Sequence, residues 1–351
     1  MPPFLSVIIP AYNAAGTIGR CLETLDRALS ETRHEILVVD DASSDKTARQ
    51  VEKLAKKLPA VRLVRHPRNQ GPGPARNSGL SEARGEFIWF VDADDEIPLA
   101  GFAGLDARAA TAGCDVLLFK YNRVDCRTRQ YSPWIDYDAR VFAGRPGDDF
   151  SAREFPPVLA TSHALWNKWF RRERVMAVGM PFPATITAED LPFTIANLYA
   201  ARRLRYLDRI LYTYREDASR LSRISDARRL GVLSVCEITE NWLLQAGVDR
   251  ECLTAFHVCK AHILLLNYKN TDKQTQERLR ESLDGYLKSL SMEMALRLAG
   301  NVWLRQDVKN RMLTLHGLNP GITAKALALY SACKKALRAF YLTITLQLKR
   351  N

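Results

Sequence analysis

Short apolar runs alternate with amphipathic segments along the N-terminal third of the chain. The apolar runs predict strands at Leu5–Pro10, Glu35–Asp40, Val61–Arg65 and Phe87–Val91. The segments between them predict helices at about Thr17–Leu29, at Asp45–Leu58 and from Pro74 to Gly85. Because strands alternate with helices, the pattern predicts an α/β fold whose mostly parallel sheet is covered by helices on both faces.

The pattern becomes less regular after about Asp115. It predicts strands near Val116–Asn122 and Gln130–Tyr137 and helical turns at Leu165–Val175. From about Leu221 onward it indicates helices alone. We therefore predict two parts, an α/β domain over residues 1–217 and a helical C-terminal region over residues 218–351.

Composition narrows the class of protein without identifying it. The apolar share of 47% and the charged share of 26% are typical of a globular chain. No apolar run reaches the ~20 residues that a membrane-spanning helix needs. The seven cysteines are scattered and form no CxxC pair. Free thiols in a reducing compartment are therefore expected, which predicts a cytoplasmic location.

The net charge of +12 indicates an anionic partner. Nucleic acid, acidic lipid head groups and diphosphate-bearing substrates all meet this condition, and charge alone does not choose among them. There is no G-x-x-x-x-G-K-[ST] phosphate loop, which disfavours an ordinary NTPase. Gly71-x-Gly73 lacks the third glycine of a dinucleotide site and is better explained as a tight bend.

Polar side chains follow several of the predicted strands at the point where each strand ends. They are Tyr12, Asn13, Asp40, Asp41, Asp92, Asp94 and Asp95. Ligands of open parallel sheets bind at the carboxyl ends of the strands. Neighbouring carboxylates repel one another unless they are solvated, hydrogen-bonded or share a cation, and carboxylates suit Mg²⁺ or Mn²⁺. A solvated acidic turn that caps the next helix is the alternative.

Several segments, in one consistent order, resemble family 2 glycosyltransferases, which have the GT-A fold. The segments are SVIIPAYN (Ser6–Asn13), EILVVDDASSDKT (Glu35–Thr47), NQGPGPARNSGLSEARGEFIWFVDADD (Asn69–Asp95), WNKWFRR (Trp166–Arg172), AEDLPF (Ala188–Phe193) and YTYREDASRLS (Tyr212–Ser222). The resemblance covers roughly the first 215 residues and is of the bacterial cell-surface polysaccharide type. It implies an inverting enzyme that takes a sugar from a nucleotide-diphosphate donor, with UDP-sugars favoured.

The resemblance also implies roles for the strand-end residues. Pro10, Tyr12, Asn13 and Asp41 stand at positions that hold the nucleotide, with the tyrosine ring stacked on the base. A turn proline, a core-edge tyrosine and a helix-capping aspartate are the structural alternatives. Ala42 stands where the family commonly has glycine.

Further residues are implied to face the diphosphate and the metal. Arg76 would face the donor's diphosphate, or else be a surface arginine. Asp92 and Asp94 resemble the DxD pair that holds Mn²⁺ or Mg²⁺, with Asp94 favoured for the metal. Asp92 would contact the ribose or the metal, and Asp95 would substitute for either. A third metal ligand, often histidine in that family, has no candidate in Tyr206–Asp226.

Glu189-Asp190 resembles the family's ED pair, in which the aspartate is the general base. An ionised carboxylate at Asp190 would take the proton of the acceptor hydroxyl as that hydroxyl attacks the anomeric carbon. Glu189 would support the loop. Alternatively, both acids only add negative charge to the first turn of a helix. His163 precedes Trp166 and either lines the acceptor pocket or is structural; Trp166 and Trp169 either stack on sugars or are core.

The C-terminal region would decide the acceptor, which the resemblance implies is a saccharide or a lipid-linked saccharide. Ile322–Asn351 is basic and without acids, and its apolar positions predict an amphipathic helix. That helix either lies on an anionic membrane surface or docks on its own domain. A homo-oligomer stays open. Rival functions are a sugar-1-phosphate nucleotidyltransferase, which should carry a glycine-rich loop that Ala11–Gly19 lacks, and a basic nucleic-acid-binding protein, which the strand-end acids oppose.

Overall fold

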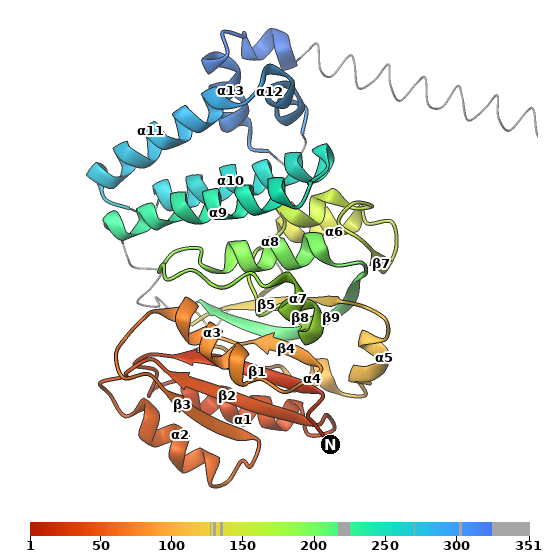
Figure 1. Cartoon of the computed structure of the whole chain (residues 1–351), viewed down its shortest axis with the longest axis vertical. Coiled ribbons are helices and arrows are strands. Elements are labelled where there is room, and N and C mark those ends of the chain that lie inside the picture. The colour runs from red at the N-terminus through yellow and green to blue at the C-terminus, as the bar shows by residue number, and fades with distance from the viewer. Residues whose placement is uncertain are drawn as a thin grey trace, which may run out of the picture. The chain divides into compact units, whose positions relative to one another are not determined.

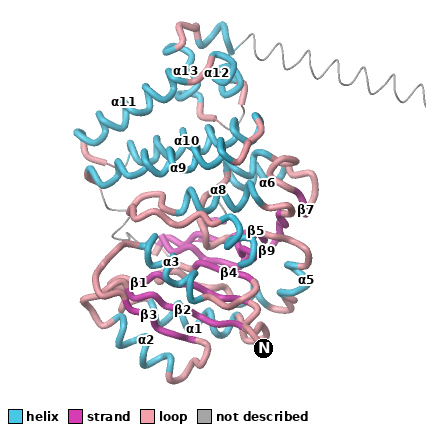
Figure 2. Tube along the Cα trace, in the orientation of Figure 1, coloured by secondary structure: helices cyan, strands magenta, loops and turns pink. Residues whose placement is uncertain are grey.

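The computed structural model describes residues 1–126, 128, 131–133, 136–216, 225–269, 271–301 and 304–324. Contacts divide the chain into a first unit, Met1–Phe256, and a second unit that begins at His257. Figure 1 shows the elements of each unit, and Figure 2 separates helix, strand and loop.

The first unit holds the whole sheet. Its strands are β1 (Leu5–Ala11), β2 (His34–Asp40), β3 (Val61–Arg65), β4 (Phe87–Phe90), β5 (Val116–Asp125), β6 (Tyr131–Pro133), β7 (Asp149–Phe150), β8 (Lys168–Arg171) and β9 (Leu204–Glu216). Its helices are α1 (Ile18–Ala28), α2 (Thr47–Ala55), α3 (Pro72–Glu82), α4 (Leu99–Phe102), α5 (Ala107–Thr111), α6 (Asp136–Ala143), η1 (Pro156–Ala160), α7 (Arg172–Val178), α8 (Asp190–Ala200), η2 (Ala227–Leu230) and α9 (Gly231–Gln245). The division between the units falls inside α10 (Arg250–Lys269).

The strands lie in the order β3-β2-β1-β4-β8-β5-β9-β7, and β6 pairs with β5 off this path. The four strands β3, β2, β1 and β4 are parallel. β8 is antiparallel to both β4 and β5, while β5 and β9 are parallel to each other. The sheet is therefore mixed rather than purely parallel, and the carboxyl ends of β1, β2 and β4 meet at one edge.

Helices cover both faces of the sheet, as right-handed crossovers require. α1 and α2 follow β1 and β2 on one face, and α3 returns to β4 across the other (Figure 1). α3 approaches the sheet closely because Gly79 has no side chain; a Cβ there would lie 2.3 Å from Ile8 Cγ2. The aromatic residues of β4 are buried on alternate faces, Trp89 against Trp169 and Phe90 against Phe193.

Within its described residues the second unit is helical. It contains the remainder of α10, then α11 (Lys273–Ser289), α12 (Met292–Ala299) and α13 (Gln306–Leu315). Leu279, Leu283 and Leu287 recur every four residues along α11 and are buried, which gives this helix one apolar face. Among the described residues, no helix combines the length and the apolarity needed to cross a bilayer.

The α/β prediction and the helical C-terminal region are confirmed, and two local predictions are confirmed only in part. Only Tyr131–Pro133 of the predicted strand Gln130–Tyr137 is described as strand, and α6 begins at Asp136. The predicted helical turns at Leu165–Val175 contain β8 before α7 begins at Arg172. β8 is extended because it pairs with β4 on one side and β5 on the other.

The predicted boundary at residue 217 marks the change from strands to helices. The contact division falls later, at Phe256 and His257, because α9 packs against α8 of the sheet-bearing unit. The basic segment Ile322–Asn351 lies outside the described residues from position 325 onward.

Candidate active site

The acidic turn that follows β4 is held in place from two other elements. The Tyr212 hydroxyl of β9 accepts a hydrogen bond from the Asp92 N–H (3.2 Å) and donates one to Asp95 Oδ2 (2.6 Å). The Arg215 N–H donates to Asp95 Oδ1 (2.7 Å). On the other side, the Cys21 thiol of α1 donates to the Asp92 carbonyl (3.6 Å). The turn is therefore a fixed part of the fold and not a loose solvated loop.

The carboxylates of this turn crowd one another. Burial raises the pKa of the Asp95 carboxyl well above its usual range, and the charges of Asp92 and Asp94 raise it further. A cation bound among these acids would offset that repulsion. The described residues contain no group of three His, Cys, Asp or Glu side chains that could hold a metal ion. The turn thus offers carboxylates suited to Mg²⁺ or Mn²⁺ without a complete ligand set.

Arg76 of α3 joins the acidic turn to a segment 113 residues further along the chain. Its side chain is buried and forms ion pairs with Asp92 Oδ1 (3.1 Å) and Glu189 Oε1 (2.6 Å). Burial alone would lower the pKa of the guanidinium, but Glu189, Asp92 and Asp190 together raise it above its usual value. Arg76 therefore contacts two other predicted site residues, Asp92 and Glu189, directly.

The Glu189-Asp190 pair stands at the start of α8. Ala188 has a left-handed backbone (φ 55°), Glu189 precedes the first helical residue, and Asp190 begins the helix. Burial raises the pKa of Glu189; the Arg76 guanidinium opposes this shift and the charge of Asp190 adds to it. Asp190 is partly exposed, and its Oδ1 lies 3.4 Å from Nε2 of His163.

Asp41 organises the loop that leads into α3. Its buried carboxylate accepts hydrogen bonds from the backbone N–H groups of Gln70 and Gly71 and lies 2.7 Å from His66 Nδ1. Tyr12 follows β1 beside it, because the Asp41 N–H donates to the carbonyl of the residue before Tyr12. Tyr12 is 50% exposed, which leaves its side chain accessible to a ligand.

The other two residues of the predicted nucleotide site have structural contacts. Pro10 lies within β1. Asn13 has a left-handed backbone (φ 51°), and its Oδ1 accepts from the N–H groups of Ser44 and Asp45. Ala42, which stands where the family resemblance expects glycine, also has a left-handed backbone (φ 60°). Asn13 therefore joins the loop after β1 to the loop after β2.

The two tryptophans of the WNKWFRR segment differ in environment. Trp169 is fully buried in the core against Trp89. The Trp166 ring is only partly buried and stacks on Tyr212 (4.8 Å between centroids, 7° between planes) and on Tyr214. Trp166 thus lies against the same tyrosine that holds the acidic turn.

Several residues of this region were not singled out from the sequence as site residues. His66 links Asp41 to the Ser78 hydroxyl (2.8 Å from Nε2), Tyr212 holds the acidic turn after β4, and Lys168 donates to the Ser162 carbonyl in the segment before β8. His66 follows β3 directly, so the strand-end rule that selected Asp41 could also have selected His66. Lys168 and Tyr212 lie within strands and carry no such signal.

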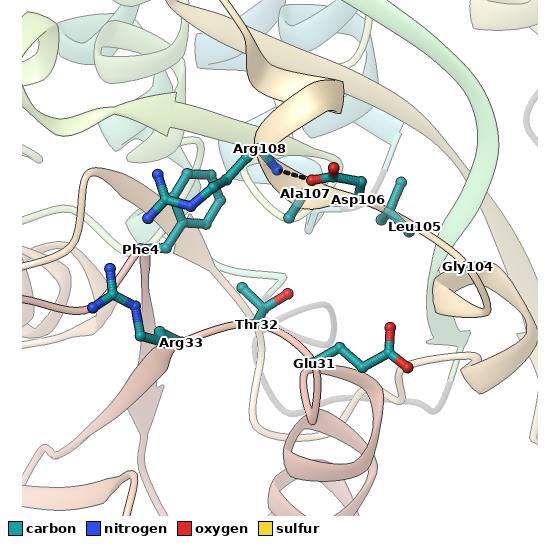
Figure 3. Close-up of a pocket in the computed structure, with 9 residues that line it drawn as sticks. All are labelled: Phe4, Glu31, Thr32, Arg33, Gly104, Leu105, Asp106, Ala107 and Arg108. Atoms are coloured by element: carbon teal, nitrogen blue, oxygen red, sulfur yellow. Dashed lines mark hydrogen bonds between the residues drawn. The ribbon is translucent and has the colours of Figure 1, made fainter.

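A pocket of 460 Å³ lies elsewhere in the first unit (Figure 3). It is lined by Phe4, Glu31, Thr32, Arg33, Gly104, Leu105, Asp106, Ala107 and Arg108. Phe4 precedes β1, so the pocket is at the amino end of that strand, whereas the candidate site is at the carboxyl end. Its lining shares no residue with the candidate site.

Comparison with known families decides among the functions considered. Residues 6–172 match the family model described as Glycosyl transferase family 2. Residues 6–172 form a domain of this family. The match contains the strand-end acids and Arg76, and it ends before Glu189 and Asp190.

Curated relatives of the chain come from several bacteria. It is 32% identical over 232 residues to the uncharacterized glycosyltransferase EpsJ of Bacillus subtilis, and the alignment covers 64% of each chain. It is 31% identical over 228 residues to the uncharacterized glycosyltransferase YibD of Escherichia coli, covering 63% of each. The matches therefore span less than two thirds of these relatives' own lengths.

Staphylococcus aureus TarS is similar in both sequence and structure. The curated protein is a poly(ribitol-phosphate) beta-N-acetylglucosaminyltransferase, 31% identical over 215 residues, covering 60% of this chain and 35% of TarS. The crystal structure of TarS residues 1–349 in complex with UDP-GlcNAc superposes with a TM-score of 0.64 at 22% identity. That superposition covers 92% of this chain and 90% of the TarS chain and shows that the fold is the GT-A fold of the family.

Proposed function

We propose that this family 2 chain transfers a hexosyl or hexosaminyl group from a nucleoside-diphosphate sugar, with UDP-sugars as the favoured donors, to a hydroxyl group with inversion. The observation that carries the proposal is the double ion pair of Arg76. It joins Asp92, at the end of β4, to Glu189, which precedes Asp190. Acids suited to a donor's metal and diphosphate and a carboxylate suited to base catalysis thus lie at one edge of the sheet.

The donor would be held by the residues at the carboxyl ends of β1, β2 and β4. The exposed Tyr12 ring would stack on the base, with Pro10, Asn13 and Asp41 shaping the loops around it. Asp94 and Asp92, with Asp95 behind them, would hold Mg²⁺ or Mn²⁺. When bound, such a cation neutralises the charge that develops on the departing nucleoside diphosphate. The buried Arg76 Nε–H, which has no acceptor among the described residues, is a donor suited to a nearby anion.

The proposed transfer is a single displacement. The acceptor oxygen forms a bond to the anomeric carbon while the bond from that carbon to the diphosphate oxygen breaks, and its electron pair leaves with the nucleoside diphosphate. Asp190 accepts the proton of the attacking hydroxyl. Glu189 holds Arg76 and so fixes the turn that carries Asp190. A nucleotidyltransferase would instead release pyrophosphate, so the released product separates the two classes.

The donor class is tested by a panel of UDP-, GDP-, CMP- and TDP-linked sugars in thermal denaturation, each with and without Mn²⁺. We expect a UDP-sugar to raise the denaturation temperature most. It should reach its full effect only when Mn²⁺ is present. The product released from that donor should be the nucleoside diphosphate. Release of pyrophosphate, or equal shifts for all four nucleotides, would contradict the proposal.

The base assignment is tested with Asp190→Asn, which keeps the size of the side chain but cannot accept the proton. Single-turnover release of nucleoside diphosphate from the selected donor, with water as the acceptor, should slow by roughly 10²–10⁴. Donor affinity in calorimetry should not change, and Glu189→Gln should be milder. A near-normal rate for Asp190→Asn would remove the base assignment.

The acceptor and the place of action are proposed from the family alone. A saccharide or lipid-linked saccharide acceptor at the cytoplasmic face of a membrane would suit an enzyme of bacterial cell-surface polysaccharide assembly. The basic segment that would contact anionic lipid lies largely outside the described residues.

A further inference from the structure

The loop between η1 and β8 is fixed from inside by a buried lysine. Lys168 is fully buried, and its ammonium group donates to the carbonyls of Ser162 (2.9 Å) and Ala164 (2.6 Å) and to Asn167 Oδ1 (2.6 Å). An ammonium group has three N–H donors, and each of these bonds holds a different point of the loop. The two carbonyls flank His163, so the clamp fixes the backbone on both sides of that residue.

His163 contacts α8 at two points. Its backbone carbonyl accepts a hydrogen bond from the Thr194 hydroxyl (2.7 Å), and its ring Nε2 lies 3.4 Å from Asp190 Oδ1. Asp190 and Thr194 are four residues apart and therefore on the same face of the helix. The bond from Thr194, one helical turn after Asp190, therefore fixes the His163 backbone in a position from which its ring faces Asp190.

The same loop is also joined to the acidic turn after β4. The Trp166 carbonyl accepts from the Trp89 indole N–H (2.7 Å), and its ring stacks on Tyr212, which bonds both Asp92 and Asp95. The loop therefore connects the proposed metal side of the site with the proposed acceptor side through packed groups.

We propose that His163 is a positioning residue for Asp190, an inference that rests on the proposed function. An ionised carboxylate only accepts hydrogen bonds, so the contact needs the proton of the ring on Nε2. The bond holds Asp190 Oδ1 and leaves the other carboxylate oxygen for the proton of the acceptor hydroxyl. The 3.4 Å separation is loose, and such contacts commonly shorten when substrate binds.

Two matched amides separate positioning from packing. In His163→Gln the side-chain amide reaches the position of the ring Nε2 and can still donate to Asp190. In His163→Asn the amide reaches only as far as Nδ1, so the donor is lost while a polar side chain of similar kind remains. His316→Gln, a histidine change in the second unit, serves as the control variant.

The rate measured is the single-turnover release of UDP from UDP-N-acetylglucosamine, or from the UDP-sugar that gives the largest thermal shift, with Mn²⁺ and water as the acceptor. His163→Asn should be slower by roughly 10- to 100-fold, the effect of losing a hydrogen bond to a charged group. His163→Gln should recover most of this loss. Calorimetric donor affinity and the denaturation midpoint should not separate the two variants.

A double variant distinguishes a failure of this inference from a failure of the proposed function. In an Asp190→Asn background, His163→Asn should cause little further loss, because both changes act on the same proton transfer. Equal rates for the Gln and Asn variants, or multiplied losses in the double variant, would overturn the positioning role while leaving the base assignment intact. A near-normal rate for Asp190→Asn alone would instead overturn the base assignment, and the positioning role with it.

Discussion

Arg76 is the residue on which the two sides of the candidate site depend. Arg76 is buried and is paired with the partly exposed Asp92 and the more enclosed Glu189, and burying a charge is costly unless it is paired. Glu189 is largely shielded from solvent, with 12% of its side chain exposed, so removal of the guanidinium would leave it without a compensating charge. The pair is therefore a structural link, and the Arg76 guanidinium offsets part of the rise in the Glu189 pKa that burial causes.

We predict that Arg76→Met destabilises the protein by about 3–5 kcal/mol, the usual cost of breaking one side of a buried ion pair. Arg76→Lys should cost less, because the ammonium keeps the charge but cannot form the planar fork that contacts both acids. Urea denaturation measures both. Arg305→Met, which removes a pair between two exposed side chains, Arg305 and Asp307, is the control and should cost at most about 1 kcal/mol. Equal losses for the methionine variants would contradict this reading.

Sequence reasoning reached the acids of the site because strand ends are visible in the hydrophobic pattern. Asp41, Asp92 and Asp94 each follow an apolar run. The contact between Arg76 and Glu189 could not be predicted from that pattern, because it joins two helix starts that only the fold brings together. The burial of Lys168 could not be predicted for another reason, because a lysine within a strand is ordinarily taken as exposed.

At the scale of elements, α3 holds the segment that leads to Glu189. The Asn77 side chain accepts from the Phe182 N–H (2.9 Å) and donates to the Phe182 carbonyl (2.8 Å). Gly73 lies against the next residue, and a Cβ there would be 2.2 Å from the Pro183 carbonyl oxygen. The start of α3 and the segment before α8 therefore fit each other through backbone contacts.

A pair of glycine substitutions tests this fit. Gly73→Ala should displace the segment around Pro183, lower the denaturation midpoint and slow donor turnover, since Asp190 lies at the end of that segment. Gly285→Ala is the matched control: it lies within α11, and a Cβ there meets no atom within 4 Å. Alanine in a helix interior is favoured over glycine by about 0.5–1 kcal/mol, so this variant should be as stable as the parent or more so. Normal turnover by a folded Gly73→Ala protein would contradict the prediction.

Strands with continuous apolar runs were predicted well, whereas β8 was not. Lys168–Arg171 is short and mixes basic and aromatic residues, which gives no period of two. Its extended form comes from its neighbours: Trp169 pairs with Trp89 of β4 on one side and with Leu117 of β5 on the other. The sequence also shows no signal for the reversal of direction at this strand, so the antiparallel pairing of β8 with β4 and β5 was not predicted.

At the scale of the whole molecule, a net charge of +12 coexists with a concentration of acids at one site. The carboxylates of Asp92, Asp94 and Asp95 repel one another, and burial adds to the cost of ionising Asp95. The excess of basic residues elsewhere does not remove this local repulsion, because solvent and salt screen distant charges. A divalent cation at the site would remove it directly.

This leads to a prediction about metal, pH and stability. The pKa of Asp95 is raised in the folded protein above its unfolded value of about 3.9, so the folded state binds this proton more tightly. The contribution of Asp95 to the free energy of unfolding is therefore present at low pH and is lost as the pH rises from about 4 through the raised pKa. Mn²⁺ binding requires the ionised acids, so it should restore stability most where the metal-free protein has lost it.

We expect Mn²⁺ to raise the free energy of unfolding more at pH 7.5 than at pH 5. At a concentration 100 times the dissociation constant, the stabilisation at pH 7.5 should approach about 2.7 kcal/mol. Asp94→Asn should reduce the effect at pH 7.5, because it removes a charged ligand of similar shape. Asp148→Asn, at an exposed acid of the same unit, should leave it unchanged. Equal stabilisation at both pH values, or an equal reduction in both variants, would show that Mn²⁺ acts elsewhere on the protein and would remove the acidic turn as its site.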